Sequence, residues 1–305
     1  MIPKLLVLVG LPASGKSTYA EELAKRHDAN IHSSDSIREE LSGDINNQNI
    51  NDLVFKTLHN RIKEDLKNGK SCIYDATNIN YKRRMAFLNE LNKIPCEKHC
   101  CFIATPYTLC LHNNAQRKRK VPMDVIERMY RHFDPPYYYE GWDYIDVVYA
   151  YEGCKKHYGD TADFIANYEF YSQDNSHHKL SLGKHCYKAY EYILDAVGYE
   201  FGAELVGASI LHDCGKPFCK TFRNNKGEYN TKEAHYYDHQ YTGSYDSFFW
   251  GTSENNPLYI ATLIRWHMQP YFLTTEKSIE KYRKLWGEDL YKDIMLLHEA
   301  DEYAH

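Results

Sequence analysis

The stretch from Gly10 to Thr18, which reads Gly-Leu-Pro-Ala-Ser-Gly-Lys-Ser-Thr, constrains this chain more than any other feature. It matches the pattern G-x-x-x-x-G-K-[ST], in which a glycine-rich turn joins a buried strand to a helix and cradles phosphate groups. The flanking sequence agrees, because residues 5–9 are apolar and residues 18–26 favour a helix. We therefore expect Lys16 to reach the β/γ phosphate oxygens and Ser17 to hold Mg²⁺. The predicted nucleotide-binding residues are Gly10, Ser14, Gly15, Lys16, Ser17 and Thr18.

Length and composition indicate a globular protein of two domains. The chain has 305 residues, of which 43% are hydrophobic and 26% are charged, and no apolar run is long enough to span a bilayer. The first strand begins without a basic and apolar leader, so we expect a cytoplasmic protein with no membrane partner. The nine cysteines form no CxxC array, which predicts reduced thiols.

Strand-like and helix-like segments alternate through residues 1–152. After the first strand, the segments 30–33, 72–74, 100–104 and 145–149 have the composition of buried strands, with helical patterns between them. This alternation predicts an α/β domain with a parallel sheet and helices on both faces.

Polar residues follow these strands where ligands collect on an open α/β sheet. Asp35 could accept a proton from an attacking hydroxyl while Arg38, one helical turn later, steadies the acceptor or a phosphate; Asp35 could equally cap a helix. Thr77 and Asn78 are read as a turn that caps the next helix, and residues 81–84 as a solvated basic turn. The run Gln116–Lys120 holds four adjacent cations and fits a lid that brings an arginine onto a transferring phosphoryl group, or else a solvated helix end.

Residues 1–152 resemble the phage-type 5′-hydroxyl polynucleotide kinases in the stretches GLPASGKST, SDSIR, DATN and QRKRKVPMDVIERM. The resemblance implies that Lys16 and Ser17 bind phosphate and Mg²⁺ and that Asp35 is the general base. It also implies that Arg38 binds the acceptor phosphate and that Arg117 is the transition-state arginine of the lid. Asp75 and Asn78 match a family segment with Ala76 inserted, which makes Asn78 a candidate substrate contact. Because the lid is shorter than the family's, Arg119 competes with Arg117 and is a second candidate for substrate binding.

The second half differs in pattern. Residues 153–165 are predicted to connect the domains, and residues 166–305 to form an all-α bundle, with helical patterns over 180–197, 203–213, 258–267, 276–286 and 288–304. Its histidines are placed near the ends and inner faces of these helices, and one is followed directly by an aspartate, which favours a transition-metal centre.

This half resembles the HD phosphohydrolase superfamily, through Leu-His-Asp-Cys-Gly-Lys-Pro at residues 211–217 and the separate histidines. The resemblance implies metal-assisted phosphoester hydrolysis with one or two ions of Mn²⁺, Ni²⁺, Co²⁺, Fe²⁺ or Zn²⁺. The implied ligands are His185, His212, Asp213 and Asp301, extended by His239 and His267 in two-metal members with Asp213 as the bridge. Lys216 and His178 are candidate substrate contacts.

Together the two resemblances imply a bifunctional polynucleotide kinase of RNA repair. Such an enzyme would use ATP or another nucleoside triphosphate with Mg²⁺, phosphorylate 5′-hydroxyl RNA or DNA ends, and remove 2′,3′-cyclic or terminal 2′/3′ phosphates. A nucleic-acid ligase would act downstream. Two alternatives stay open: a nucleoside kinase fused to a nucleotidase, and a kinase regulated by a non-catalytic HD sensor.

Overall fold

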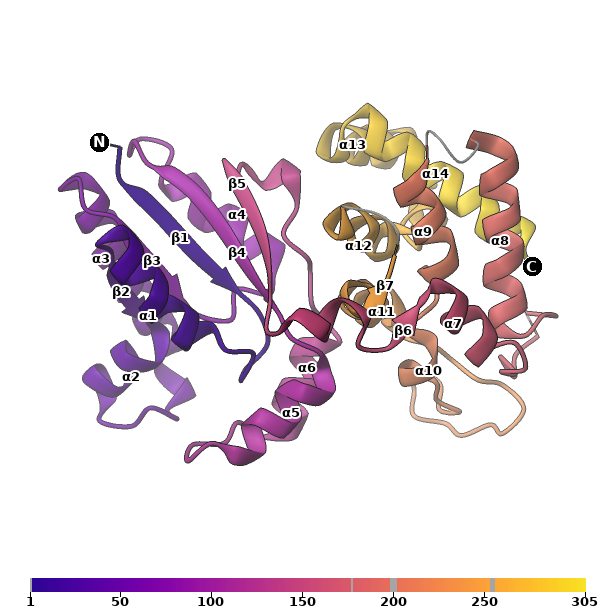
Figure 1. Cartoon of the computed structure of the whole chain (residues 1–305), viewed down its shortest axis with the longest axis horizontal. Helices are drawn as coiled ribbons and strands as arrows, with labels where there is room; N and C mark the ends of the chain where they lie inside the picture. The colour runs from indigo at the N-terminus through magenta and orange to yellow at the C-terminus, as the bar shows by residue number, and fades with distance from the viewer. Residues whose placement is uncertain (1, 177, 198–201, 253–255) are drawn as a thin grey trace. The chain divides into compact units, whose positions relative to one another are not determined.

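The computed structural model describes residues 2–176, 178–197, 202–252 and 256–305 (Figure 1). The chain divides into two compact units: the first comprises Met1–Ile126 and Pro136–Tyr151, the second Glu127–Pro135 and Glu152–His305. The helices found among these residues are too short or too polar to cross a bilayer. All nine cysteines are free, as predicted.

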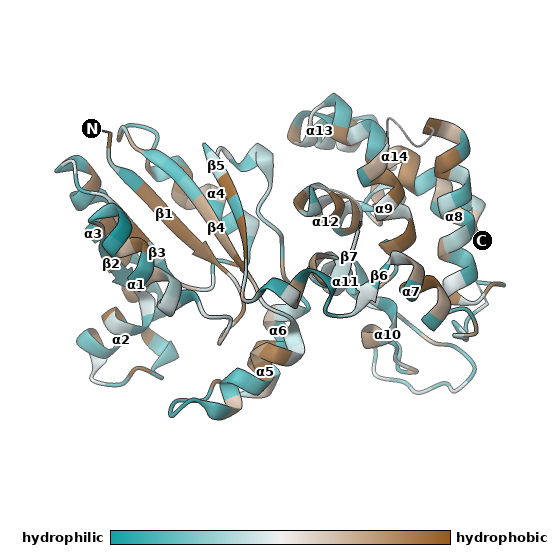
Figure 2. Cartoon of the chain, in the orientation of Figure 1, coloured by the Kyte–Doolittle hydropathy of each residue, from teal (hydrophilic) through white to brown (hydrophobic). Residues whose placement is uncertain are grey.

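The first unit is built on a five-stranded sheet in the order β2-β3-β1-β4-β5, in which each neighbouring pair is parallel. The strands are β1 (Lys4–Val9), β2 (Asn30–Ser33), β3 (Cys72–Asp75), β4 (Glu97–Ala104) and β5 (Tyr144–Tyr149). Strand β1 lies at the centre, is buried from Leu5 to Val9, and is hydrophobic over most of its length (Figure 2). An apolar strand of this kind is stable only with both of its faces covered.

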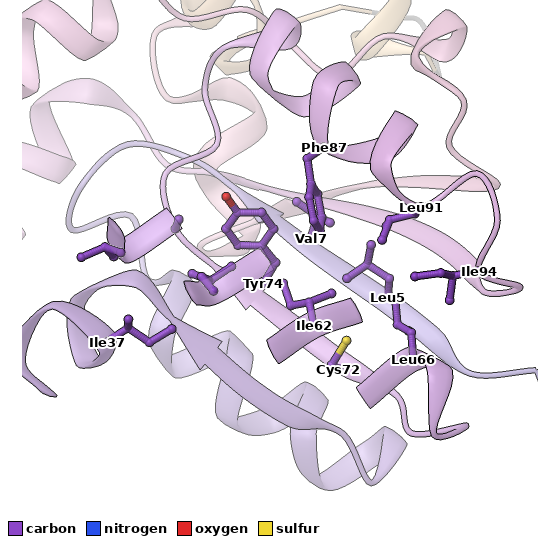
Figure 3. Close-up of a cluster of buried hydrophobic side chains, with 13 residues drawn as sticks. Leu5, Val7, Ile37, Ile62, Leu66, Cys72, Tyr74, Phe87, Leu91 and Ile94 are labelled. Carbon is purple, nitrogen blue, oxygen red and sulfur yellow. The ribbon is translucent and has the colours of Figure 1, made fainter. Parts of the chain in front are cut away.

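Helices cover both faces of the sheet, which confirms the predicted α/β architecture. On one face, β1 and β3 pack through Leu5, Val7 and Tyr74 against helices α2, α3 and α4 (Figure 3). On the other face, Leu6 and Leu8 pack against helix α1. The helices are α1 (Lys16–His27), α2 (Ser34–Ser42), α3 (Asn51–Lys67), α4 (Tyr81–Glu90) and α5 (Tyr107–Gln116). The carboxyl ends of β1, β2 and β3 consequently share one edge of the sheet.

Helix α4 differs from the sequence prediction at its first turn. Its cap is Asn80, whose side chain accepts a hydrogen bond from the Arg83 N–H, so Thr77 and Asn78 do not cap it. The basic turn is also not uniformly solvated, because Arg84 is buried. Arg84 donates to both carboxylate oxygens of Glu140, at 2.8 and 2.6 Å, and Glu140 also accepts from the Trp142 indole. Each charge of the pair is thus neutralised and hydrogen-bonded, which makes its burial tolerable.

Among its described residues the second unit is mainly helical, with one pair of two-residue parallel strands, β6 (Gly159–Asp160) and β7 (Trp250–Gly251), and an irregular stretch over residues 220–238 that contains two isolated antiparallel bridges. Helix α8 packs against α9 and α14, α9 against α12, and α12 against α11, so five different helices contribute to one core. The unit contains α7 (Thr161–Asn167), α8 (Leu182–Val197), α9 (Ala203–Leu211), α10 (Lys216–Cys219), α11 (His239–Asp246), α12 (Pro257–Trp266), α13 (Glu276–Trp286) and α14 (Glu288–Tyr303).

The division of the chain differs from the predicted boundaries in two places. Residues 152–165 belong to the second unit, and so do residues 127–135, which include the end of α6 (Met123–Tyr130). Residues 127–135 belong to the second unit because their side chains form hydrogen bonds with residues of that unit. The Tyr130 hydroxyl donates to Asp246 at 2.6 Å, and the Arg265 guanidinium donates to Asp134 at 3.0 Å.

Candidate functional sites

The loop between β1 and α1 has the backbone conformation of a phosphate-binding turn. Gly10 and Gly15 have φ values of +154° and +99°, and Ala13 also lies in the left-handed region at +62°. A Cβ on Gly10 would come within 2.8 Å of the Ser14 hydroxyl and 3.0 Å of the Ile103 carbonyl oxygen, so only glycine fits there. Gly15 precedes helix α1, whose first residues are Lys16, Ser17 and Thr18. The first N–H groups of a helix that starts here are available to a phosphate.

Two side chains beside this turn are suited to a phosphate and its cation. The Lys16 ammonium donates to the Leu11 carbonyl at 2.7 Å, and the Ser17 hydroxyl donates to Asp75 at 3.0 Å. Burial lowers the pKa of Lys16 to about 8, although Asp75 opposes the shift. Burial also raises the pKa of Asp75, against the charge of Lys16. An anion beside Lys16 and a cation beside Asp75 would each relieve an unfavourable buried charge.

Asp35 and Arg38 lie together on helix α2, at the edge where β2 ends. The Arg38 guanidinium donates to Asp35 Oδ1 and to the Asn51 side chain, both at 2.9 Å. Arg38 is only 4% exposed, so its orientation is fixed by these partners. Asn51 is a residue that sequence reasoning missed, because nothing in its local pattern separates it from an ordinary helix start.

The two competing arginines of the basic run differ in their surroundings. Arg119 donates to Asp35 Oδ2 at 2.5 Å, and its other nitrogens donate to the Asn46 side chain and the Ile45 carbonyl. The Arg117 side chain is exposed. Burial of Lys16 is the main cause of its lowered pKa, and the positive charge of Arg117 contributes to the same lowering. Arg119 therefore lies at the Asp35 end of the site, and Arg117 acts on the Lys16 end.

Asn78 is held against the sheet. Its side-chain nitrogen donates to the Leu8 carbonyl at 2.9 Å, and its backbone has a φ of +46°. The neighbouring Thr77 carbonyl accepts from the Gly10 N–H at 3.0 Å. Asn78 thus braces the end of β1 next to the phosphate-binding turn.

In the second unit, four of the six predicted metal ligands form one buried cluster. The ligand atoms of His185, His212, Asp213 and Asp301 all lie within 4.8 Å of one another. His185 Nε2 is 3.0 Å from Asp301 Oδ1 and 3.3 Å from Asp213 Oδ2. The residues come from helix α8, the end of α9 and helix α14, so packing of three helices assembles the group.

The other two predicted ligands form a second group that shares Asp213. His239 Nε2 lies 3.2 Å from Asp213 Oδ1 and 3.2 Å from His267 Nε2. The two oxygens of Asp213 therefore face different groups of histidines, Oδ2 toward His185 and His212 and Oδ1 toward His239 and His267. This is the arrangement of a carboxylate that bridges two sites.

The hydrogen bonds of the imidazoles indicate which nitrogen is free to bind a metal. A backbone carbonyl only accepts hydrogen bonds, so an Nδ1 beside one carries the proton and leaves the Nε2 lone pair open. Nδ1 lies next to such a carbonyl in His185 (Ala304, 3.3 Å), His212 (Ser209, 2.7 Å), His239 (Tyr236, 2.8 Å) and His267 (Ile264, 2.6 Å). The Nε2 atoms of His185 and His212 nevertheless approach to 3.1 Å. Two lone pairs aimed at each other are unfavourable unless a proton or a metal ion lies between them. The imidazole and carboxylate donors of this group are of the kind that a borderline transition metal prefers.

The charges of the cluster support the same interpretation. Burial opposes ionisation of Asp213, but Lys216 and His212 hold its pKa well below the usual range. Burial and the neighbouring His239 lower the pKa of His267 to about 3, so this ring is neutral at pH 7. Metal binding requires ionised carboxylates and neutral imidazoles, a state that Asp213 and His267 already have. Burial opposes protonation of His185 and His212, but Asp213 and Asp301 raise the pKa of His185 and raise that of His212 to about 10, so a metal bound there would displace a proton from His212.

Lys216 and His178 border the first group. The Lys216 ammonium lies 2.6 Å from Asp213 Oδ2 and donates to Gln173 at 2.9 Å, and it is 3.1 Å from His178 Nε2. Sequence reasoning missed Gln173 and also Tyr271, whose hydroxyl donates to Asp301 Oδ2 at 3.1 Å. No spacing in the sequence distinguishes either residue.

Gly215 allows Asp213, the carboxylate shared by the two groups, to lie close to His239 of the second group. A Cβ built on Gly215 would come within 2.2 Å of the His239 carbonyl oxygen and 2.5 Å of the Gly243 N–H nitrogen. We expect Gly215→Ala to push α11 away from Asp213, because two backbones meet at this point and neither is free to move alone. The expected result is a destabilisation of about 1–3 kcal/mol and a loss of bound transition metal. Thermal melting and elemental analysis of the purified protein measure the two effects.

Gly207→Ala is the matched control. The nearest atom to the added methyl group is the flexible end of Ile260, at 3.1 Å, and Thr252 lies at an ordinary contact distance of 3.7 Å, so metal content should be retained. Equal metal loss in both variants would contradict the role given to Gly215.

Comparison with known proteins adds to this geometry. Residues 5–136 match a family model described as an AAA domain. The chain is 31% identical over 149 residues to L-seryl-tRNA(Sec) kinase of Methanococcus maripaludis. The matched region covers 47% of this chain and 58% of that protein. The chain is 26% identical over 155 residues to the protein kti12 of Schizosaccharomyces pombe, covering 46% and 54%. Among solved structures, the Pnkp1/Rnl/Hen1 RNA repair complex matches with a TM-score of 0.37 and 23% identity, over 42% of this chain and 43% of that chain.

The strand, the glycine turn and the lysine give the first unit the geometry of a P-loop domain, and one of the relatives similar to this region is a kinase. The chain spans a little more than half the length of the curated relatives it matches.

Proposed function

We propose that this chain heals broken nucleic-acid ends with two activities. The first unit transfers the γ-phosphoryl group of ATP or another nucleoside triphosphate to a 5′-hydroxyl end of RNA or DNA. The second is an HD-type phosphohydrolase that removes a 2′,3′-cyclic or terminal 2′ or 3′ phosphate. The observation that supports the proposal most strongly is the position of Asp35. This carboxylate, suited to activating a hydroxyl, lies at the edge of the sheet beside the phosphate-binding loop, in a chain that also contains a buried His–Asp cluster.

In the kinase reaction, Lys16 and the N–H groups of the loop hold the donor phosphates. Ser17, with Asp75 beside it, would hold Mg²⁺, which would offset part of the negative charge of the triphosphate. Asp35 takes the proton of the attacking hydroxyl, and Arg38 fixes Asp35 from its buried side. Arg117 is assigned to the transferring phosphoryl group, because its charge acts on Lys16, and Arg119 to the acceptor.

In the hydrolase reaction, His185, His212, Asp213 and Asp301 would hold one ion, and Asp213, His239 and His267 a second. When bound, such a pair polarises a phosphoester and acidifies a water molecule. Lys216 orients the shared carboxylate through its 2.6 Å contact with Oδ2. His178, beside Lys216, is placed to contact the substrate phosphate.

A second candidate acceptor comes from the relative that is an L-seryl-tRNA(Sec) kinase. Its name describes phosphoryl transfer to a hydroxyl of an amino acid carried on tRNA, so both candidates attach the acceptor hydroxyl to a nucleic acid. Healing of strand ends is preferred because it also gives the second unit a substrate. The product ends suit a nucleic-acid ligase, which is the proposed partner in the cytoplasm.

The deciding experiment offers the protein one short RNA with a 5′-hydroxyl and a 2′,3′-cyclic phosphate. With ATP, Mg²⁺ and either Mn²⁺, Ni²⁺ or Co²⁺, we expect mass spectrometry to show a phosphorylated 5′ end and a hydrolysed 3′ end. Free nucleosides and seryl-tRNA are compared as acceptors. Faster phosphorylation of either would replace the proposed acceptor, and an unchanged 3′ end with every metal would favour a sensor role for the second unit.

A further inference from the structure

We infer that the second unit binds the single strand whose terminal phosphate it removes along a row of aromatic rings and cations beside the metal-ligand groups. This inference rests on the proposed hydrolase function and adds what that site recognises: the nucleotides that precede the terminal phosphate, as well as the phosphate itself. The residues that form this aromatic–cation row are Tyr171, Lys220, Phe222, Arg223 and Tyr229.

The members of the aromatic–cation row contact one another in turn. The Lys220 ammonium lies 4.6 Å from the ring centroid of Tyr171 and 5.8 Å from that of Phe222. The Phe222 and Tyr229 rings meet edge to face, with their centroids 6.4 Å apart, and the Arg223 guanidinium lies 5.5 Å from the Tyr229 centroid. Each ring therefore has a cation beside it, which is the combination that binds the bases and phosphates of a single strand.

The row begins beside the first group of metal ligands. Lys216, which borders that group, donates to the Gln173 side chain at 2.9 Å. Lys220 follows one helical turn later, and its ammonium donates to Asp174 at 2.6 Å. Both lysines are thus anchored to the segment 171–174. A strand whose last phosphate reaches Lys216 consequently has the row beside its preceding nucleotides.

The far end of the row lies on a segment that extends from the helices. Residues 220–238 follow α10 as an irregular loop (Figure 1), with one antiparallel bridge between Thr221 and His235 and another between Arg223 and Tyr229. Tyr229 is 63% exposed. Single exposed rings are ordinary on a protein surface, but a continuous row that ends in solvent is typical of a surface that binds a partner.

The charge of this region identifies the partner as a polyanion. Residues 216–232 contain five Lys and Arg and one acidic residue, whereas residues 151–305 as a whole contain 16 and 23. A local excess of cations on an acidic half of the chain attracts a nucleic acid to this place. Arg223 is exposed and donates to an uncharged group, the Gly227 carbonyl, at 3.1 Å, so its charge is available to a phosphate. We therefore assign Arg223 to a phosphate, and Phe222 and Tyr229 to bases.

Tyr229→Ala tests the inference with two substrates, a short RNA that ends in a 2′,3′-cyclic phosphate and a 2′,3′-cyclic mononucleotide. With Mn²⁺, we expect the wild type to prefer the RNA. In the variant, kcat/KM for the RNA should fall about tenfold, as loss of one stacked base predicts. The value for the mononucleotide, which has no preceding base, should stay within about twofold. Tyr187→Ala removes an exposed ring of α8 outside the row and should change neither value.

Arg223→Gln gives a second readout, which a merely structural role would not change. Contact with a phosphate makes log kcat/KM for the RNA fall linearly as log salt concentration rises. Loss of one such contact should make this slope shallower by about 0.7. An unchanged slope would contradict the assignment of Arg223.

An equal loss on both substrates in Tyr229→Ala, or no loss on the RNA, would overturn the inference. Failure of the wild type to hydrolyse either substrate with Mn²⁺, Ni²⁺ or Co²⁺ would count against the proposed function instead. The row is then judged by ultraviolet cross-linking of the full chain to a thiouridine-labelled RNA with a 5′-phosphate. Cross-links that map to residues 220–229 would support the row, and their absence from that segment would overturn it.

Discussion

Asp213→Asn is expected to reduce metal-dependent phosphoester hydrolysis by at least about 10³-fold, because several kcal/mol of charge stabilisation depend on the metal pair. Its two oxygens face the two groups of histidines separately, so one substitution affects both. An amide removes the negative charge and turns one oxygen into a donor. That donor would repel the Lys216 ammonium on one side, or on the other side donate to the His239 Nε2 lone pair that a metal would otherwise use.

Two measurements separate this effect from general damage. Elemental analysis should show bound metal falling together with hydrolysis, while 5′-end phosphorylation in the same preparation should stay within twofold, about 0.4 kcal/mol, of the wild type. Asp195→Asn is the matched control: it removes an exposed carboxylate from helix α8, which also carries His185, and should change neither activity. Hydrolysis retained in Asp213→Asn, or a parallel loss of phosphorylation, would show that the two centres are wrongly assigned.

The parts of the fold that the sequence predicts are those set by neighbours along the chain. The apolar run of β1, the glycines of the turn and the alternation of strands and helices are local patterns, and all five predicted strands of the first unit are present. Helix α11 was missed because its sequence, His-Gln-Tyr-Thr-Gly-Ser-Tyr-Asp, has few apolar positions and contains a glycine. It is held by packing against α12 instead.

Most features that the sequence did not predict depend on contacts between residues that are far apart along the chain. The local sequence predicts that Arg84 is exposed. In the structure it is buried, because Glu140, 56 residues away, neutralises its charge. Residues 127–135 continue a helix of the first unit in sequence, but Asp134 pairs with Arg265 of the second. The resemblance predicted the six His and Asp residues as ligands, and the structure brings them together in two groups that share Asp213. Tyr271 and Gln173 could be found only from the structure. Local patterns thus predict elements and motifs, while pairing between distant residues decides unit boundaries and the environment of each charge.

Lys16→Met is expected to lower kcat/KM for phosphorylation by about 10²–10³-fold, the range found when one preorganised donor is removed from a site of developing charge. Methionine keeps the length and apolar stem of the side chain but has no ammonium to replace the contact with the Leu11 carbonyl or to hold a phosphate. Lys25→Met is the matched control on the same helix, since Lys25 is exposed. Hydrolysis by the second unit should be unaffected in both variants.

The pH dependence of nucleotide binding gives this prediction a second readout. Burial lowers the pKa of Lys16 to about 8, so the free protein loses this proton as the pH rises through that value. A bound phosphate favours the charged form, and binding above about pH 8 must therefore take up a proton. The wild-type KM for ATP should accordingly rise above that pH, by up to about tenfold per pH unit, while that of Lys16→Met should stay flat. A wild-type profile without this rise would mean that Lys16 does not hold the donor phosphates, whatever the activity of the variant.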